Sequence, residues 1–255
     1  MRILVTNDDG ILAPGILALR RALADLGEVT VVAPTTAQSA VGHGITLTDP
    51  VRVHRISLGD GATGYSVEGR PADCIKLAIL ELLPERPDLV VSGINLGSNV
   101  GINVLYSGTV AAAVEGAFYG IPSLAVSLSD SDTVDFDGAA RIARRLIDQL
   151  VARNLQRPVL LNVNVPDLSK GPPKGIRIVP QGLKGWREGW ERRSDPRGRT
   201  YYWMVGDQDR PVHVPDGFRL LWGQAFEYVH WATFVRQGRE ALYQSTSRLA
   251  TADCV

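Results

Sequence analysis

The sequence predicts an α/β protein with a Rossmann-like, doubly wound and mainly parallel sheet, followed by a C-terminal β-rich arm. Short apolar runs rich in β-branched residues alternate with helical segments over the first 165 residues, and parallel strands need such crossover connections. The composition changes near residue 181, because all five tryptophans follow it. The length of 255 residues fits one large domain with an appendage. We therefore expect a Rossmann-like core over residues 1–180, then an arm and a return segment over 181–255.

The first strand–helix–strand unit has clear boundaries. Residues 2–6 form a short apolar run that ends at Asn-Asp-Asp-Gly, a sequence typical of turns. Pro14 suits a first helical turn, and apolar residues then recur at helical spacing up to Gly27. Residues 29–32 read as a buried strand, and a loop of small and polar residues follows over 34–44.

The alternation continues along the rest of the core. We expect strands at 45–47, 51–56, 89–91, 123–128 and 158–165, helices at 71–83, 109–119 and 138–152, and a long Gly/Asn loop at 93–108. Beyond the core, we expect residues 181–225 to form a projecting hairpin that packs on a second copy, because aromatic residues are enriched at subunit interfaces. The alternative is a layer that packs on the chain's own sheet.

Composition excludes some classes of function. The chain has 27 Lys and Arg against 27 Asp and Glu, and a zero net charge disfavours binding of nucleic acid or anionic membrane by a broad basic surface. Its apolar stretches fall far short of the ~20 residues that a membrane-spanning helix needs. Two cysteines are too few for a disulfide framework, and the N-terminus lacks the features of a signal peptide. We expect a soluble, cytoplasmic protein.

Oxygen-bearing side chains follow three of the predicted strands. Asp8 and Asp9 follow the first, Ser39 follows the second, and Asn95 follows the strand at 89–91. Ligands of parallel sheets bind beyond the carboxyl ends of the strands, and adjacent carboxylates repel unless a cation or a proton lies between them. Carboxylate, hydroxyl and amide oxygens suit Mg²⁺ or Mn²⁺ better than Zn²⁺. The alternative is that Asp8 and Asp9 cap the helix that begins near Pro14.

The loop from Ser92 to Thr109 is rich in glycine and asparagine. Glycines allow backbone N–H groups to point at a ligand, and Ser107-Gly108-Thr109 opens a helix whose N-terminus can bind an anion. A phosphate there would face a metal at Asp8 and Asp9. The alternative is a purely structural loop, although loops longer than about 12–15 residues are uncommon in compact domains unless functional.

Several motifs together resemble the SurE (survival protein E) family. They are NDDG at 7–10, Ser39 followed by GHGITL, GRPADC at 69–74, SGIN, GSNVG and YSGTV between 92 and 116, and GRTYYW at 198–203. The resemblance spans roughly 1–205. It implies a Rossmann-like core with an exchanged C-terminal arm, a homodimer or homotetramer, and one Mg²⁺ or Mn²⁺ per subunit. The implied activity is a phosphatase acting on nucleoside 5′- and 3′-monophosphates.

The resemblance also implies roles for individual residues. Asp8, Asp9, Ser39 and Asn95 would hold the metal, which is the set found at the strand ends, while Asn95, Asn99, Ser107, Gly108 and Thr109 would face the phosphate. Asp8 and Asp9 are the candidate catalytic residues. The nucleophile is either a metal-activated water or an Asp carboxylate, and we favour water with Asp8 as the base. Two positions depart from the family pattern: Arg70 replaces a threonine, and the sequence diverges after Gly238.

Other side chains and functions are weaker candidates. His43 could move a proton, but its glycine neighbours favour a solvated or capping loop residue, and Lys76 has no partner in any motif. A receiver-type signalling domain needs a lysine after its last strand, which Ser127-Leu128-Ser129 does not offer. A nucleotide- or RNA-binding protein without catalysis remains the alternative, since residues 182–199 carry six basic residues against three acidic ones among tryptophans.

Overall fold

The computed structural model describes residues 1–59, 61–152, 159–179, 181–182, 185–212 and 229–234. Nine strands within these ranges form the main sheet: β1 (Arg2–Thr6), β2 (Glu28–Pro34), β3 (Val53–Gly59), β4 (Ala62–Val67), β5 (Leu89–Leu96), β6 (Ser123–Leu128), β7 (Leu160–Val165), β8 (Ile176–Val179) and β11 (Val229–Phe234). Their order is β3-β4-β2-β1-β5-β6-β7-β11-β8. The strands from β4 to β11 run parallel, and β3 and β8 pair antiparallel at the edges. The predicted fold class is confirmed.

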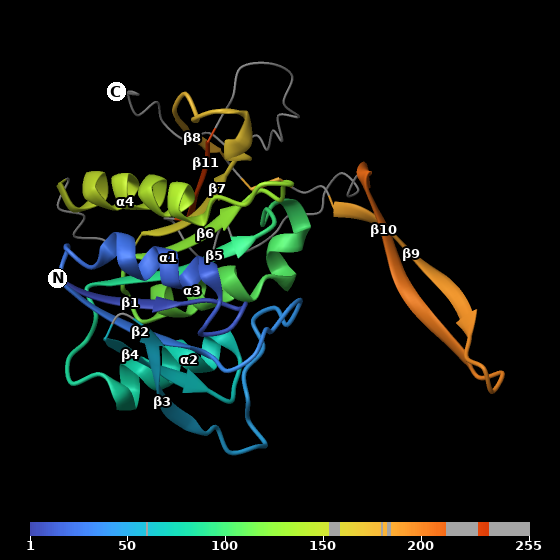
Figure 1. Cartoon of the computed structure of the whole chain (residues 1–255), viewed down its shortest axis with the longest axis horizontal. Coiled ribbons are helices and arrows are strands. Elements are labelled where there is room, and N and C mark those ends of the chain that lie inside the picture. The colour runs from blue at the N-terminus through green and yellow to red at the C-terminus, as the bar shows by residue number, and fades with distance from the viewer. Residues whose placement is uncertain (60, 153–158, 180, 183–184, 213–228, 235–255) are drawn as a thin grey trace.

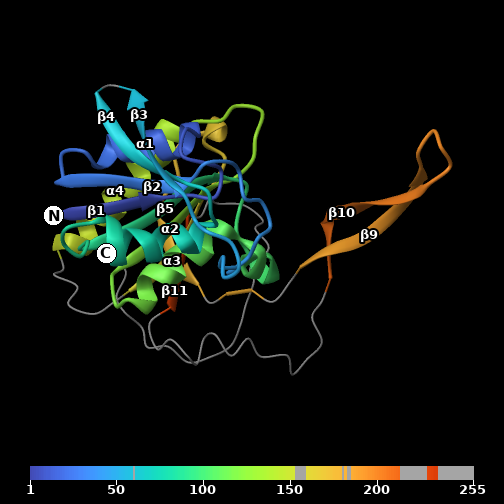
Figure 2. The same cartoon turned by 90° about the horizontal axis from the view of Figure 1, so that it is seen from below.

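Helices cover both faces of this sheet (Figures 1 and 2). They are α1 (Pro14–Leu23), α2 (Pro71–Leu77) with a π-helical continuation η1 (Ala78–Leu82), the 3₁₀ helix η2 (Gly101–Tyr106), α3 (Gly108–Phe118), α4 (Phe136–Ala152) and the 3₁₀ turn η3 (Leu168–Lys170). Successive side chains of β1 point to opposite faces of the sheet and so show which helices pack on each face. Ile3 and Val5 pack in the cluster that includes α1 and α4, whereas Leu4 packs in the cluster that includes α2.

The predicted strand at 45–47 is wrong. Thr46 donates its backbone N–H and its hydroxyl to the carboxylate of Asp73 at 2.9 and 2.6 Å, so a side chain takes the place of a neighbouring strand. Two short strands, β4 and β8, were not expected. The buried strand that begins at Leu89 runs on to Leu96, and η2 occupies part of the expected 93–108 loop.

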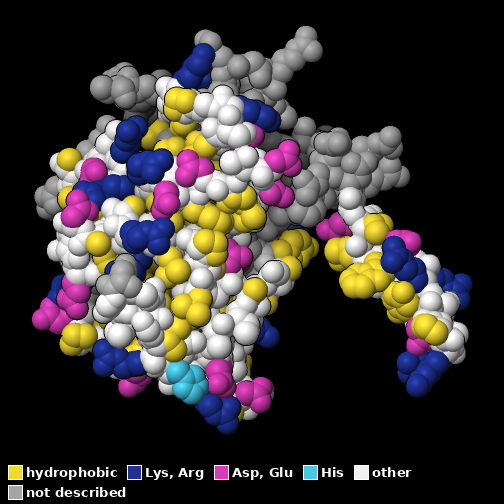
Figure 3. Space-filling model, in the orientation of Figure 1, with side chains coloured by type: hydrophobic (Ala, Val, Ile, Leu, Met, Phe, Trp, Pro, Cys, Tyr) yellow, Lys and Arg dark blue, Asp and Glu magenta, His cyan; other side chains and the backbone are white. Residues whose placement is uncertain are grey.

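The arm is an antiparallel hairpin of β9 (Gly185–Ser194) and β10 (Thr200–Val212) that projects away from the body in both views (Figures 1 and 2). At its tip, the carboxylate of Asp195 accepts the backbone N–H groups of Arg197 and Arg199, both at 2.9 Å. Exposed aromatic and apolar side chains lie along the hairpin (Figure 3): Trp190, Tyr201, Tyr202, Trp203, Met204 and Val205.

After the arm, the chain returns to the main sheet. β11 inserts between β7 and β8, with Val229 opposite Leu160 and Trp231 opposite Val179. β11, which belongs to the predicted second unit, thus joins the sheet of the predicted first unit, residues 1–180. The division of the chain at residue 180 remains a prediction. The divergent segment after Gly238 lies outside the described residues. Along the described part of the chain, no helix has both the length and the apolar character needed to cross a membrane.

Candidate active site

Asp8 and Asp9 lie in a tight turn at the carboxyl end of β1. The side chain of Asn7 shapes this turn, because it donates to the Gly10 carbonyl at 2.9 Å and accepts the Gly10 N–H at 3.2 Å. Gly10 has a φ of +102°, which favours glycine. The residue that precedes α1 is Ala13, and no side chain caps that helix. The alternative role of Asp8 and Asp9 as helix caps is therefore wrong.

The N-terminus of α3 packs directly against Asp8. Thr109, which is fully buried, donates its hydroxyl to Asp8 Oδ1, and Ser107 caps the helix by accepting the Val110 N–H at 3.1 Å. A methyl group on Gly108 would lie 2.8 Å from the Asp8 Cβ atom, so only glycine allows this approach. The structure thus brings together Asp8 and the predicted Ser107–Thr109 group, which lie about one hundred residues apart in the sequence.

Among the residues that the structure describes, no cationic side chain compensates the charge of the two carboxylates. Burial raises the pKa of Asp8, although hydrogen bonds from the Thr109 side chain and from the backbone of Thr109 and Gly108 act in the opposite direction. Burial, followed by repulsion from Asp8, raises the pKa of Asp9 to about 6. No cationic side chain contributes to either shift. This turn is therefore a place where a bound cation would relieve electrostatic cost.

Ser39 belongs to a segment that we call the strap, residues 38–46, which follows β2 and lies over α2 and α3. The first strap residue is tied to the carboxylate turn, because the Gln38 N–H donates to the Asp8 carbonyl at 2.7 Å. Ser39 itself is exposed. The tie places the backbone next to Ser39 beside the carboxylate turn, and the gathering of the Ser39 side chain with Asp8, Asp9 and Asn95 remains a prediction.

Asn95 and Asn99 occupy different surroundings. Asn95, near the end of β5, donates its side-chain amide to the Gly97 carbonyl at 2.6 Å, which leaves its amide oxygen as the acceptor that could hold a metal. Asn99 donates its side-chain amide to Ser127 Oγ at 2.8 Å, so it lies at the ends of β6 and β7. Within the described residues, the hydrogen bonds of Asn99 go to side chains of β6 and β7 and not to Asp8 or α3.

Two buried asparagines of β7 were missed from the sequence. Asn164 accepts the Asn99 N–H at 2.8 Å, and Asn162 and Asn164 both donate to the Asn99 carbonyl, at 2.8 and 3.1 Å. They fix the backbone of Asn99. The signal was present, because two asparagines at alternate positions interrupt an otherwise apolar run of a buried strand.

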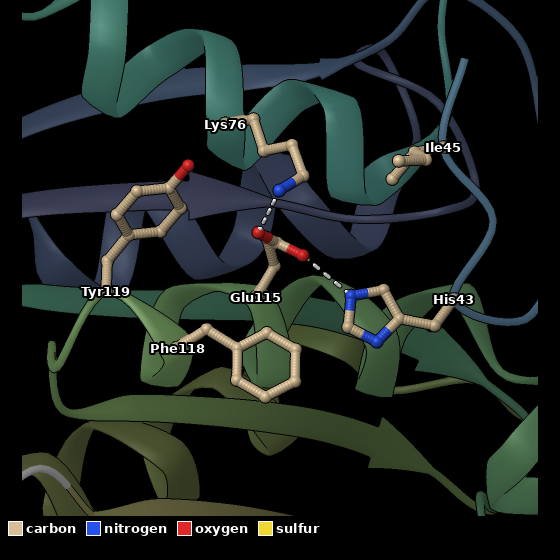
Figure 4. Close-up of a pocket in the computed structure, with 6 residues that line it drawn as sticks. All are labelled: His43, Ile45, Lys76, Glu115, Phe118 and Tyr119. Atoms are coloured by element: carbon tan, nitrogen blue, oxygen red, sulfur yellow. Dashed lines mark hydrogen bonds and ion pairs between the residues drawn. The ribbon is translucent and has the colours of Figure 1, made fainter. Parts of the chain in front are cut away.

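An open cavity of about 490 Å³ lies beside the strap, between α2 and α3 (Figure 4). Glu115, with a side chain only 4% exposed, points into a group formed with His43 and Lys76: His43 Nε2 lies 2.7 Å from Glu115 Oε2, and Lys76 Nζ lies 2.7 Å from Glu115 Oε1. The His43 ring stacks on Phe118 with a centroid distance of 5.5 Å. The prediction of a solvated or capping His43 is wrong, and Lys76 has a partner that no motif indicated.

The pKa of Glu115 is shifted in the opposite direction to the pKa of Asp8. Burial acts to raise the pKa of Glu115, but hydrogen bonds from His43 and Lys76 outweigh it and lower the pKa overall. Arg70, the first of the two departures from the family pattern, is an exposed residue at the N-cap of α2. Its guanidinium lies against Gly44 of the strap, so it contacts the segment that carries Ser39.

Comparisons with known proteins agree with this arrangement. The family model described as Survival protein SurE matches residues 3–188. A protein named 5′-nucleotidase SurE from Rhodopirellula baltica is 53% identical over 213 residues, covering 83% of this chain and 84% of that protein. Its namesake from Heliobacterium modesticaldum is 52% identical over 208 residues, covering 81% of this chain and 76% of that protein.

A solved structure is also similar. The crystal structure of the SurE protein from Aquifex aeolicus matches with a TM-score of 0.71 and 36% identity, covering 92% of this chain and 93% of that one. The family model thus spans most of the chain, and the sheet and its flanking helices have a counterpart in a member of the same family. The chain belongs to the SurE family.

Proposed function

We propose that this protein is a metal-dependent phosphomonoesterase, a 5′-nucleotidase that also accepts nucleoside 3′-monophosphates and releases nucleoside and phosphate. The observation that carries this proposal is the contact between Asp8, one of two adjacent carboxylates with raised pKa values, and the N-terminus of α3, because this contact would join a cation site to an anion site. Relatives at about half identity bear the name 5′-nucleotidase, which supports the choice of substrate.

The donor set fits one hard divalent cation per subunit, Mg²⁺ or Mn²⁺. Asp8, Asp9, Ser39 and Asn95 would supply carboxylate, hydroxyl and amide oxygens, which these ions prefer. This set contains neither Cys nor His, the ligands typical of zinc. When bound, the ion would neutralise phosphate charge and acidify a water molecule.

The start of α3 would bind the phosphate. Ser107 satisfies the Val110 N–H, whereas the backbone N–H groups of Gly108 and Thr109 are directed at the Asp8 carboxylate and act against the rise of its pKa that burial causes. They are thus already directed at an anionic oxygen. In the proposed complex these groups would bind phosphate oxygens, with Asn95 and Asn99 at the neighbouring strand ends. Positioning and neutralisation supply much of the catalysis of phosphoryl transfer.

Asp8 is the proposed general base. Its Oδ1 accepts the Thr109 hydroxyl, which leaves Oδ2 to take a proton from the attacking water. A carboxylate whose pKa is raised by burial is a better proton acceptor near neutral pH than an ordinary aspartate. The alternative nucleophile, a carboxylate oxygen that attacks phosphorus, would leave an acyl phosphate on the protein, and rapid acid quench would trap it.

The arm is proposed to pack on a second copy and so to form a homodimer or homotetramer. Its exposed tryptophan, tyrosine and methionine side chains are the types enriched at interfaces. The proposed compartment is the cytoplasm. Sedimentation of the intact chain and of a Trp203→Asp variant tests assembly: we expect the wild type to sediment as an oligomer and the variant as a smaller species.

The activity is tested by phosphate release from nucleoside 5′- and 3′-monophosphates. We expect turnover with Mg²⁺ or Mn²⁺ that EDTA abolishes and that readdition of metal restores. Asp8→Asn should remove this turnover. Retention of full metal-dependent activity by Asp8→Asn would contradict the assignment of Asp8. Nucleotide or RNA binding without phosphate release, with a steep dependence on salt, would instead favour the non-catalytic alternative.

A further inference from the structure

The strap has no helix or strand of its own, yet it is tied along its length. The Gln38 N–H donates to the Asp8 carbonyl at 2.7 Å, and the Gly42 N–H donates to the Tyr106 carbonyl at 2.9 Å. Tyr106 immediately precedes Ser107, the cap of α3. Ser39 therefore sits between a tie to the carboxylate turn and a tie to the start of the proposed phosphate site.

The buried carboxylate of Glu115 anchors the middle of the strap. It joins His43 of the strap to Lys76 of α2, each at 2.7 Å, and it belongs to α3 (Figure 4). A lowered pKa keeps it ionised, so it accepts hydrogen bonds from both partners. Glu115 is seven residues, close to two helical turns, beyond Gly108, so both residues lie on the same face of α3. One helix face thus carries the proposed phosphate site and this anchor.

A second carboxylate anchors the end of the strap. Asp73 is buried and accepts three hydrogen bonds: the N–H and the hydroxyl of Thr46 at 2.9 and 2.6 Å, and the N–H of Arg70 at 2.9 Å. The last of these bonds fixes Asp73 to the start of α2. The strap is therefore attached to α2 and α3 on the far side of Ser39.

The backbone next to Ser39 shows that this attachment is needed. Ala40 and Gly42 both have a φ of +56°, and Ala40 is the one non-glycine residue with a positive φ in the described part of the chain. Residues hold such conformations when the surrounding structure over-determines them. Ser39 is followed directly by this turn, so its direction depends on the ties on either side.

We propose that His43, Glu115 and Lys76 form a positioning cluster that holds Ser39 in the proposed metal site. This inference rests on the proposed function, because the role of Ser39 does. Buried ion pairs are weak evidence for stability alone, since apolar residues often fill the same space at no cost. Here the pairs join three elements around a ligand-bearing segment. Loss of the cluster should weaken metal binding and leave the chemistry intact once metal saturates the site.

The test compares Glu115→Gln with a matched surface variant. Glu68 also joins a histidine and a cation, His54 at 3.2 Å and Arg52 at 3.3 Å, but these groups are exposed. His54 lies on β3, Arg52 just before β3, and Glu68 just after β4. Glu68→Gln is therefore the control. We expect Glu115→Gln to weaken Mn²⁺ binding, measured by calorimetry, by about 10- to 100-fold, the usual effect of losing a group that orients a ligand. Faster amide exchange at 38–46 should accompany it, and Glu68→Gln should match the wild type.

Two variants of His43 distinguish a loss of positioning from a general loss of stability. His43→Ala removes the contact to Glu115, whereas the side-chain amide of His43→Gln can still donate to the carboxylate. We expect His43→Ala to reproduce the loss of Mn²⁺ affinity, with kcat restored at saturating Mn²⁺, and His43→Gln to recover much of the affinity. A mere loss of stability would not respond to added Mn²⁺ in this way.

The outcomes separate the two proposals. If the wild type shows no metal-dependent phosphate release, the proposed function fails. If the wild type is active but Glu115→Gln and His43→Ala bind Mn²⁺ as it does, with unchanged exchange at 38–46, the positioning role is wrong while the function stands. An equal loss of affinity in Glu68→Gln would also overturn it.

Discussion

Two acidic sites lie along α3, and they differ in how their charge is compensated: the Asp8–Asp9 turn, where Asp8 packs against the start of the helix, and Glu115 of the helix itself. In the turn after β1, Asp8 and Asp9 meet no cationic side chain of the described residues, and their pKa values are raised. Further along, Glu115 holds His43 and Lys76, and its pKa is lowered. A carboxylate that is paired with cations links the elements that carry them. An unpaired, partly buried carboxylate has an electrostatic cost that a bound cation can relieve. The difference separates a candidate reaction site from its support.

The largest expected effect is that of Asp8→Asn. This change removes a charge from the uncompensated group, so we expect metal-dependent phosphate release to fall by a factor on the order of 100 or more, while the metal-free protein becomes no less stable, because repulsion with Asp9 is relieved. Activity assays and thermal unfolding measure the two quantities. A large loss of stability in this variant would break the comparison.

Glu115→Gln should have the opposite signature. It weakens the anchoring of His43 and Lys76, so we expect a loss of about 2 kcal/mol in the free energy of unfolding, less than for a fully buried pair because Lys76 is partly exposed. Denaturant unfolding measures this quantity. Glu68→Gln, at the exposed counterpart, should change it by less than about 0.5 kcal/mol. Equal effects of the two variants would show that burial does not distinguish them.

The pH dependence of stability sharpens the contrast. The folded pKa of Asp9, about 6, lies above its usual value of 3.8, so protonation favours the folded state, and this contribution is lost as pH rises through 6. Glu115 has a lowered pKa, so its contribution is present above its ordinary pKa and is lost as pH falls through the lower folded value. Lowering the pH from 7 to 5 should therefore stabilise the metal-free wild type relative to Asp9→Asn.

The measurement for this prediction is the melting temperature of both proteins at each pH. The difference between them isolates Asp9 from other titrating groups. Addition of Mn²⁺ at pH 7 should stabilise the wild type more than Asp9→Asn, because a bound cation, like a proton, offsets the negative charge of the Asp9 carboxylate. Parallel pH profiles for the two proteins would contradict the uncompensated state of Asp9.

The smallest expected effect lies in the strap between the two groups. Ala40→Gly relieves a left-handed backbone but increases the freedom of the unfolded chain, and these terms nearly cancel, so we expect stability to change by less than about 0.5 kcal/mol. Mn²⁺ affinity should stay at the wild-type value, because the ties of the strap remain. A marked loss of affinity would show that the anchors alone do not fix Ser39.

Local chemistry allowed much of this architecture to be predicted. The turn after β1 and the start of α1 follow from Asn-Asp-Asp-Gly and Pro14, which act within a few residues. The position of Asp8 at a ligand-binding edge followed from one topological rule for parallel sheets, and the expectation that Ser107–Thr109 faces it came from the helix that begins there. That rule needs only the approximate strand ends, so it survives errors in element boundaries.

Contacts between individual side chains away from the strand ends could not be predicted. Glu115 and His43 are 72 residues apart, and no periodicity in either segment indicates that they meet. The strand expected at 45–47 failed for the same reason, because the carboxylate that captures Thr46 comes from 27 residues further along the chain. Alternating apolar residues show that a segment can pair as a strand. They do not show which group in the folded chain will take its hydrogen bonds.

The insertion of β11 has a consequence for synthesis of the chain. β8 pairs with β11 alone among the described strands, and β11 also completes the edge of β7. A nascent chain that has emerged as far as the end of the arm therefore has a sheet with one parallel position still empty. Because chains fold from the N-terminus as they are made, the arm leaves the ribosome before the body that carries it can close. Its exposed tryptophans are thus accessible to solvent while the edge of β7 still lacks its neighbouring strand.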